Sequence, residues 1–183
     1  MIPSLELNPE RKFTYVEQAF FTRWYKEQTP KMQDRVKALV KNEQLSFVNG
    51  GWCMHDEAAT HYMGMLDQTK LGHDFLKETF DFVPTVGWQI DPFGHSSTQA
   101  ALLSAEAGFD ALYFGRIDYQ DLNLRRDEKR VEGIWRGSES LGDNAQVFWG
   151  LTGSYGGNYG PPSGFNWVSV FFLVVVFFVC LFI

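Results

Sequence analysis

The sequence predicts an α/β fold in which short parallel strands alternate with helices. Three observations support this class. Strand-like segments are separated by segments with helical spacing, the connections are long enough for crossovers, and polar residues follow the strand ends. Strands joined by crossover helices lie parallel, so these observations allow either an open sheet or a barrel.

The first two strand and helix units lie between residues 12 and 51. Residues 12–17 (KFTYVE) form a strand-like segment that ends on Glu17. Aromatic residues recur at helical spacing across 20–25, and apolar residues lie at i, i+4, i+7 and i+8 across 32–40, which predicts an amphipathic helix. Residues 45–48 form a second strand, ended by an Asn-Gly-Gly turn.

The following units extend to residue 116. A helical pattern covers 61–80, and a strand follows at 86–90. Ser96 or Ser97 can cap a helix that continues through Ala107, with Gly108 closing it. The next strand covers residues 111–114 and runs into Gly115 and Arg116.

Residues beyond 116 give weaker signals. Short strands are predicted at 133–136 and 146–149, and a loop rich in Gly, Pro and Asn covers 153–166. From residue 168 to 183, fifteen of sixteen residues are apolar. A helix of that length measures about 24 Å, against a hydrocarbon core of ~30 Å. A membrane anchor is one interpretation, but no Lys or Arg flanks the segment, which favours sequence foreign to the domain.

The distribution of charge limits the partners. Residues 51–110 carry two lysines against nine acidic residues, and the whole chain has a net charge of −6. An acidic middle disfavours nucleic acid and favours cations or neutral, hydroxyl-rich ligands, although a solvated acidic face would look the same. Two cysteines are too few for a disulfide framework, and no signal peptide is visible at the start.

Polar residues gather where the predicted strands end. They are Glu17, the loop 49–57, Asp91 and Arg116. In both open sheets and barrels, ligands bind at the carboxyl ends of parallel strands. These ends are therefore the expected position of a functional site.

Asp91 is the strongest candidate among these residues. It ends the strand in GWQIDPFGHSST (87–98), where Pro92 restricts its backbone to an extended conformation and Gly94 permits a tight turn. A turn or cap role is the alternative, but Ser96 and Ser97 are better placed to cap the next helix. We expect a rigidly held carboxylate at the rim of the sheet.

The segment HDEAATH (55–61) does not predict a metal site of its own. His55 and His61 are six residues apart, which places them on different faces of a helix, and the zincin spacing is four. Asp56 and Glu57 are expected to orient neighbours or contact ligand hydroxyls. His95 is expected to be a hydrogen-bonded support.

The segment GWQIDPFGHS resembles the glycoside hydrolase family that contains the lysosomal acid α-mannosidases and Golgi α-mannosidase II. Residues 13–29, 47–62 and 108–121 agree with the same family in order and spacing, and GSYGGNYGPPSGFNW (153–167) is similar to its lysosomal members. The resemblance covers about residues 3–167.

The resemblance implies a parallel β/α barrel with a zinc ion at its carboxyl rim, held by two histidines and two aspartates. Asp91 would be both a zinc ligand and the nucleophile. Phe93 would contact the bound mannose, and Arg116 would keep the nucleophile ionised. Tyr155 or Tyr159 would supply a substrate-binding tyrosine.

The expected function is therefore that of a retaining, zinc-dependent α-mannosidase of the lysosome or vacuole, acting on glycoprotein N-glycans. Residues 1–167 would form part of the catalytic domain, truncated at both ends, and residues 168–183 an apolar tail. The remaining zinc ligands and the general acid match no residue here, so we expect the chain alone to be inactive.

Two other functions are compatible with the residues. A small α/β hydrolase could pair Asp91 with Glu17 or Asp56 as its two carboxylates. A non-catalytic remnant, anchored to a membrane through 168–183, could bind mannose through Asp91, Phe93 and Arg116.

Overall fold

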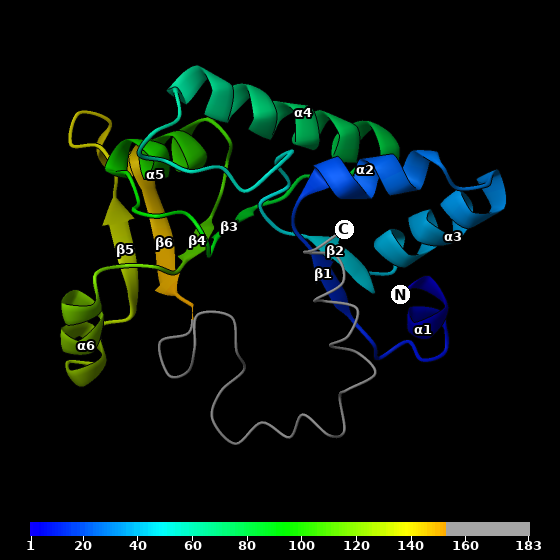
Figure 1. The fold of residues 1–183 in the computed structure, drawn as a ribbon, viewed down its shortest axis with the longest axis horizontal. Helices are drawn as coiled ribbons and strands as arrows, with labels where there is room; N and C mark the ends of the chain where they lie inside the picture. Colours follow the sequence, from blue (N-terminus) through cyan, green and yellow to red (C-terminus); the bar gives the residue numbers. More distant parts are fainter. Residues whose placement is uncertain (153–183) are drawn as a thin grey trace.

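The computed structural model describes residues 1–152, which form an α/β arrangement of strands covered by helices (Figure 1). The strands are β1 (Phe13–Tyr15), β2 (Leu45–Phe47), β3 (Val86–Gln89), β4 (Ala111–Phe114), β5 (Glu132–Arg136) and β6 (Gln146–Leu151). The helices are α1 (Ile2–Glu6), α2 (Gln18–Lys26), α3 (Pro30–Lys41), α4 (Tyr62–Phe80), α5 (Ser97–Ala105), α6 (Tyr119–Asp127) and the 3₁₀ turn η1 (Gly142–Ala145).

The strands form two sheets. β1 and β2 make a parallel pair, and the second sheet has the order β3-β4-β6-β5, in which β3, β4 and β6 are parallel. β5 is antiparallel to β6, so the expectation of a wholly parallel sheet is wrong at this edge. Only residues 137–145 connect β5 to β6. This connection is too short for the crossover that a parallel pair needs.

Asn49 connects the two sheets at the carboxyl end of β2. Its backbone N–H donates to Val86 O at 2.7 Å, and its side-chain Oδ1 accepts from Trp88 N at 3.3 Å. Asn49 has φ +59°, in the left-handed region that asparagine tolerates. β2 and β3 are therefore neighbours, but the strands of residues 1–152 do not close into a barrel.

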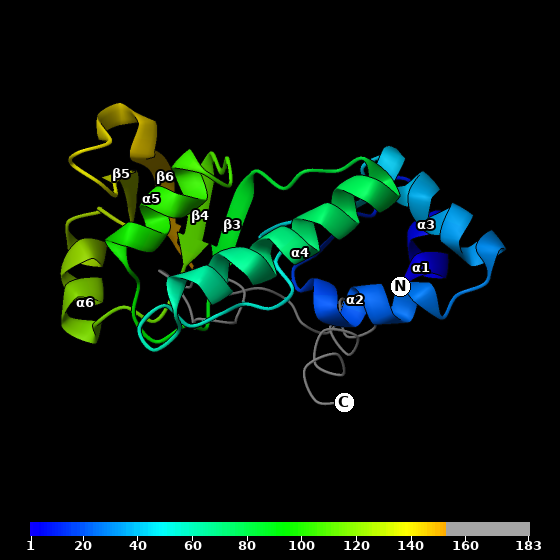
Figure 2. The ribbon, with the colours of Figure 1, turned by 90° about the horizontal axis from the view of Figure 1, so that it is seen from above.

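Helix α4 extends across both sheets (Figure 2). Gly72 lets it pack closely on the turn after β2, since a Cβ there would lie 2.0 Å from Gly50 O. One residue later, His73 Nε2 donates to Asn49 O at 2.8 Å, and its ring lies 5.7 Å from that of Phe109. The helix thus fixes the junction at which the sheets meet.

Two apolar cores hold the elements together. In the first, Phe21 of α2 is surrounded by the rings of Tyr25, Phe47, Phe75 and Phe80. In the second, side chains of α5 pack on β4 and β6, with Ala100, Leu103, Leu112, Phe114, Val147 and Leu151 buried. Ser96 caps α5 by accepting from Gln99 N, so of the two predicted caps the first is the one used.

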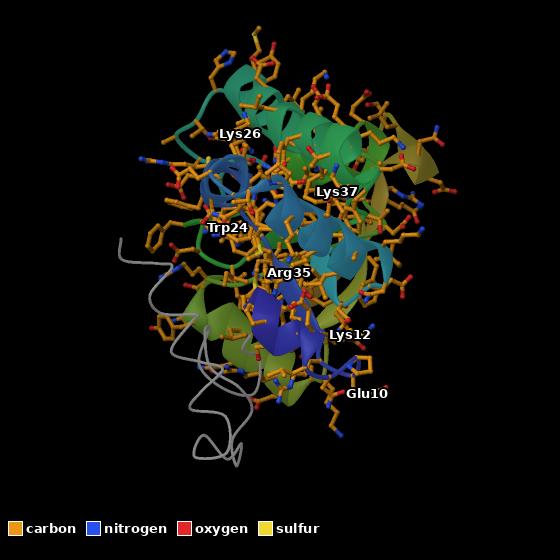
Figure 3. The ribbon with its side chains drawn as sticks, turned by 90° about the vertical axis from the view of Figure 1, so that its right-hand side faces the viewer. Glu10, Lys12, Trp24, Lys26, Arg35 and Lys37 are labelled. Atoms are coloured by element: carbon orange, nitrogen blue, oxygen red, sulfur yellow. The ribbon has the colours of Figure 1, made fainter. Side chains whose placement is uncertain are left out.

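Two helices were not predicted from the sequence. Helix α1 has only five residues, and it is joined to α3 by an ion pair in which Arg35 Nε donates to Glu6 Oε1 at 2.7 Å. Figure 3 shows Arg35 on the side of the molecule where α1, α2 and α3 lie. Helix α6 buries none of its residues and begins at Asp118, whose carboxylate accepts from Gln120 N and Asp121 N.

Candidate functional site

Asp91 lies just beyond the carboxyl end of β3, with its side chain directed to solvent. The side chain is 57% exposed, whereas the neighbouring Pro92 is buried. The carboxylate therefore lies at the rim of the sheet and not in the apolar core. Its position agrees with the predicted rim carboxylate.

Arg116 binds Asp91 from the neighbouring strand. Arg116 Nε donates to Asp91 Oδ1 at 2.7 Å, and Nη2 lies 2.6 Å from the same oxygen. Arg116 has φ +52°, an unusual backbone conformation for a residue other than glycine. A guanidinium at this distance favours the ionised form of a carboxylate.

Phe93 completes a group of three side chains at the rim. The guanidinium carbon of Arg116 lies 4.5 Å from the centroid of the Phe93 ring, in a cation–π contact. The ring is 70% exposed. It therefore presents an apolar surface next to the carboxylate, and the structure brings together three of the residues that the sequence singled out.

The loop after β2 holds the Asp91 loop through two consecutive acidic residues. Asp56 Oδ1 accepts from Phe93 N at 3.2 Å, and Glu57 Oε2 accepts from Ser96 N at 2.6 Å. Both carboxylates thus orient neighbouring backbone, which is one of the two roles that the sequence predicts for Asp56 and Glu57.

His95 connects the same loop to the end of β4. Its Nε2 donates to Gly115 O at 2.6 Å, and its Nδ1 lies 3.4 Å from Glu57 Oε1. The ring packs on Phe114 with centroids 4.5 Å apart. His95 is therefore a hydrogen-bonded support, as the sequence suggested.

The other residues of the HDEAATH segment have separate contacts. His55 Nδ1 donates to Asp56 O at 3.1 Å, and its Nε2 accepts from Gln99 Nε2 at 2.9 Å. His61 caps α4 by accepting from Met63 N. The two histidines thus serve different elements.

Glu17 and Cys53 lie on another part of the rim. Glu17 Oε1 accepts from Met54 N at 2.9 Å. Cys53 is an exposed residue, but desolvation of its thiol is the largest cause that raises the pKa of Cys53, and the nearby Glu17 charge acts in the same direction. A raised thiol pKa lowers the fraction of thiolate, so Cys53 is not an activated nucleophile.

The described residues do not form a zinc site by themselves. Zinc takes four ligands in structural sites and three protein ligands in catalytic ones. Among residues 1–152, no three His, Cys, Asp or Glu side chains gather as a metal site. The donor set therefore does not fit zinc without ligands from outside this part of the chain.

Two sequence-based predictions lie outside the described residues. They are the substrate-binding role of Tyr155 or Tyr159 and the nature of the apolar segment 168–183. Within residues 1–152, no helix has both the length and the apolar character needed to cross a membrane.

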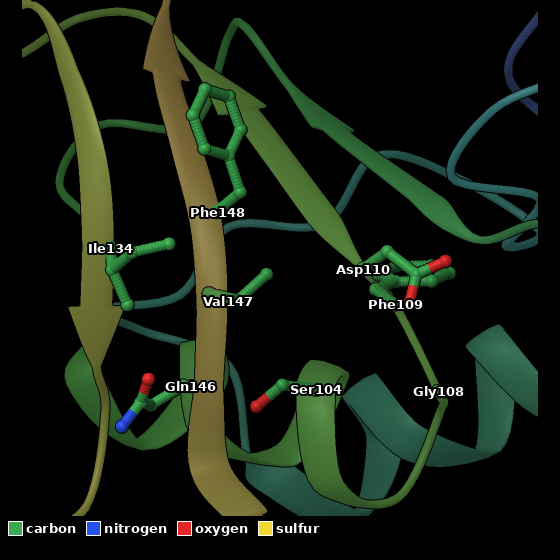
Figure 4. Close-up of a pocket in the computed structure, with 8 residues that line it drawn as sticks. All are labelled: Ser104, Gly108, Phe109, Asp110, Ile134, Gln146, Val147 and Phe148. Atoms are coloured by element: carbon green, nitrogen blue, oxygen red, sulfur yellow. The ribbon is translucent and has the colours of Figure 1, made fainter. Parts of the chain in front are cut away.

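A hollow of about 370 Å³ lies at the amino ends of β4 and β6, and Figure 4 shows the residues that line it. It is lined in part by Asp110, Gln146 and Phe148, where β4 and β6 begin. In parallel α/β sheets, ligands bind at the carboxyl ends of the strands, and this hollow lies at the amino ends. We therefore assign the candidate site to the rim that carries Asp91.

Sequence reasoning missed the role of Asn49 and the contact between Glu57 and His95. The Asn-Gly-Gly run predicts a turn at a polar strand end, but it does not show that Asn49 joins β2 to β3, although Asn is one of the few residues that readily takes a positive φ. The Glu57–His95 contact joins residues 38 positions apart and left no signal in the local pattern.

Together, the fold and the three rim side chains mark the edge at which α/β domains bind ligands. Residues 1–170 match the model of the glycosyl hydrolases family 38 N-terminal domain. The chain belongs to this family.

Similar curated proteins are α-mannosidases. The chain is 55% identical over 166 residues to an alpha-mannosidase of Canavalia ensiformis, covering 91% of this chain and 17% of that protein. It is 52% identical over 165 residues to a lysosomal alpha-mannosidase of Dictyostelium discoideum, covering 90% of this chain and 16% of that protein. The chain thus spans about one sixth of the length of these relatives.

A solved structure with a similar fold is the 4-alpha-glucanotransferase of Thermococcus litoralis. The TM-score is 0.62 with 18% sequence identity, and the match covers 82% of this chain and 22% of that chain. At this identity the similarity concerns the fold alone.

Proposed function

We propose that this chain is part of the catalytic domain of a retaining α-mannosidase that removes mannose from glycoprotein N-glycans in a lysosome or vacuole. Family membership and 50–55% identity to α-mannosidases support the activity. The observation that carries the proposal is the position of Asp91, half-exposed at the rim and bound by Arg116.

Asp91 would act as the nucleophile. In a retaining glycosidase, a carboxylate attacks the anomeric carbon as the bond to the leaving oxygen breaks, which gives a covalent ester between enzyme and sugar. Water then cleaves that ester from the opposite face, so two inversions give net retention. A second carboxyl group must protonate the leaving oxygen, and we assign this role to no described residue.

Arg116 and Phe93 would prepare the site. The guanidinium favours the ionised form of Asp91, which the attack requires. The exposed ring of Phe93 offers a flat apolar surface to the carbon-bound hydrogens of mannose. Tyr155 or Tyr159 would bind substrate hydroxyls, and zinc, with Asp91 as one of its four ligands, would bind sugar hydroxyls.

A chimera tests the proposal. Residues 1–152 replace the matching segment of the Canavalia ensiformis enzyme, to which the chain is 55% identical. We expect the chimera to hydrolyse an aryl α-mannoside, and Asp91→Asn to lower kcat by about 10⁴-fold or more, since removal of a nucleophile has effects of this size. An Asp91→Asn chimera with undiminished turnover would contradict the proposal.

Asp110→Asn is the matched control. Asp110 is an exposed aspartate directly before β4, at the amino end of the strand, whereas Asp91 lies at the carboxyl end of β3. The same change of charge there should leave kcat unchanged. The unfused chain, tested with the same substrate and zinc, should show no turnover.

A further inference from the structure

Glu57 is a buried carboxylate that lies apart from the Asp91–Arg116 pair. Its side chain is 2% exposed. A buried carboxylate is costly unless it is paired and hydrogen-bonded. Each oxygen of Glu57 has a polar partner, since Oε2 accepts from Ser96 N at 2.6 Å and Oε1 faces His95 Nδ1 at 3.4 Å.

These contacts and its burial assign Glu57 a supporting role. A general acid or metal ligand needs an oxygen that can reach the ligand, but both oxygens of Glu57 face protein groups. Its neighbour Asp56 is also used for support, because it accepts from Phe93 N. The two acidic residues therefore hold the loop after β3 at two points.

His95 connects Glu57 to Gly115, directly after β4. A carbonyl oxygen can only accept, so His95 Nε2 must donate its proton to Gly115 O at 2.6 Å. His95 Nδ1 faces Glu57 Oε1 at 3.4 Å, so the ring contacts both loops. The His95 side chain is 6% exposed and packs on Phe114, so its orientation is fixed on several sides.

Gly115 directly precedes Arg116, whose backbone has φ +52°. A non-glycine residue in this conformation costs roughly 1 kcal/mol or more and persists where its surroundings enforce it. The hydrogen bond from His95 fixes the peptide before this residue. A continuous path therefore leads from Glu57 through His95 and Gly115 to Arg116 and Asp91.

We propose that Glu57 and His95 are positioning residues that set the Asp91–Arg116 pair by joining the loops after β2, β3 and β4. This inference deepens the proposed function, because Asp91 is the group that is positioned. It concerns geometry, and its test therefore measures hydrogen exchange and not turnover.

The full-length chain provides an internal reference for the test. Arg116 Nε donates to Asp91 Oδ1 and Arg35 Nε donates to Glu6 Oε1, each at 2.7 Å. Arg35 belongs to the α1–α3 pair and not to the rim. The exchange rates of the two Nε–H protons with water, measured by ¹⁵N NMR, compare the site with an ion pair of the same geometry.

We expect Glu57→Ala to accelerate exchange of the Arg116 Nε–H by about tenfold and to leave that of Arg35 unchanged, since loss of a charge-assisted hydrogen bond has effects of this order. The amide of Ser96 should lose protection in the same variant. Glu57→Gln, which keeps an acceptor for Ser96 N, should give a smaller effect. Glu78→Ala, at an exposed site on α4, should give none.

Two results would overturn the inference: unchanged exchange at Arg116, or equal acceleration at both arginines. If Glu57→Ala does not fold, the exchange rate of the Arg116 Nε–H is measured in Glu57→Gln and His95→Phe instead. Phenylalanine preserves the ring packed on Phe114 but removes both hydrogen bonds. If the chimera with the Canavalia ensiformis enzyme is inactive while Arg116 responds to Glu57→Ala, the proposed function fails and the positioning role stands.

Discussion

Asp91 and Arg116 follow two neighbouring parallel strands at equivalent positions. β3 and β4 pair in register with Gln89 opposite Phe114; Asp91 lies two positions beyond Gln89, and Arg116 two positions beyond Phe114. Arg116 Nε and Asp91 Oδ1 are 2.7 Å apart. The ion pair thus follows directly from the strand register, and the backbone of Arg116, at φ +52°, completes the approach.

Substitution of Arg116 should change the stability of the fold mainly through the backbone conformation at this position. Exposed ion pairs contribute about 0–1 kcal/mol, so Arg116→Ala should lower the free energy of unfolding only slightly. Arg116→Gly should be more stable than Arg116→Ala by about 1 kcal/mol, since glycine adopts a positive φ without strain. Urea unfolding of the two variants checks the order, which a more stable alanine variant would contradict.

The position of Asp91 and Arg116 at the rim could be predicted because it depends on strand ends. Asp91 and Arg116 each follow an apolar strand, and the carboxyl ends of adjacent parallel strands meet at one edge. The cation–π contact of Phe93 with Arg116 could not be predicted in the same way, because it depends on the turn at residues 92–94.

The elements that escaped prediction lack the patterns on which prediction depends. Helix α6 has no fully buried residue, and its sequence accordingly lacks the apolar stripe from which a helix is predicted. The direction of β5 is a different case: residues 137–145, between the two predicted strands, are too few for a crossover, so the sequence already favours the antiparallel pairing. Glu57 and His95 meet only because the loop after β2 folds over the loop after β3.

Gly72 should be among the least replaceable residues of the described chain. A Cβ at this position would lie 2.0 Å from Gly50 O and 2.7 Å from Gly51 C, and backbone atoms cannot yield as a flexible side chain can. We expect Gly72→Ala to destabilise the fold by about 3 kcal/mol through overpacking. Thermal or urea unfolding measures the change.

Gly64 on the same helix is the matched control for this change. A Cβ at Gly64 meets nothing within 4 Å. Gly64→Ala should therefore stabilise α4 by about 0.5–1 kcal/mol, as alanine replaces glycine in an exposed helical position. Similar effects of the two substitutions would show that the Gly72–Gly50 contact is not as close as described.

Zinc should not stabilise this chain by itself. A ligand that binds the native state raises the melting temperature according to its concentration relative to Kd. Residues 1–152 contain no group of three potential zinc ligands, so excess zinc should leave the melting temperature unchanged. A zinc-dependent rise that Asp91→Asn abolishes would instead reveal a site of useful affinity.

His73 should make the fold less stable in mild acid. Burial, the largest cause, lowers the pKa of His73 from its usual value of 6.5, although the hydrogen bond to Asn49 acts in the opposite direction. Below about pH 6.5 the unfolded chain therefore binds a proton at His73 that the folded chain resists, so the stability contribution is present above this pH and is lost as the pH falls. The free energy of unfolding should decrease from pH 7.5 toward pH 5 in part because of this residue.

His73→Gln retains a donor for Asn49 O but cannot titrate, so the unfolding free energy of this variant should fall less steeply over the same range. Equal slopes for the two proteins, measured by urea unfolding, would show that His73 is not the group responsible.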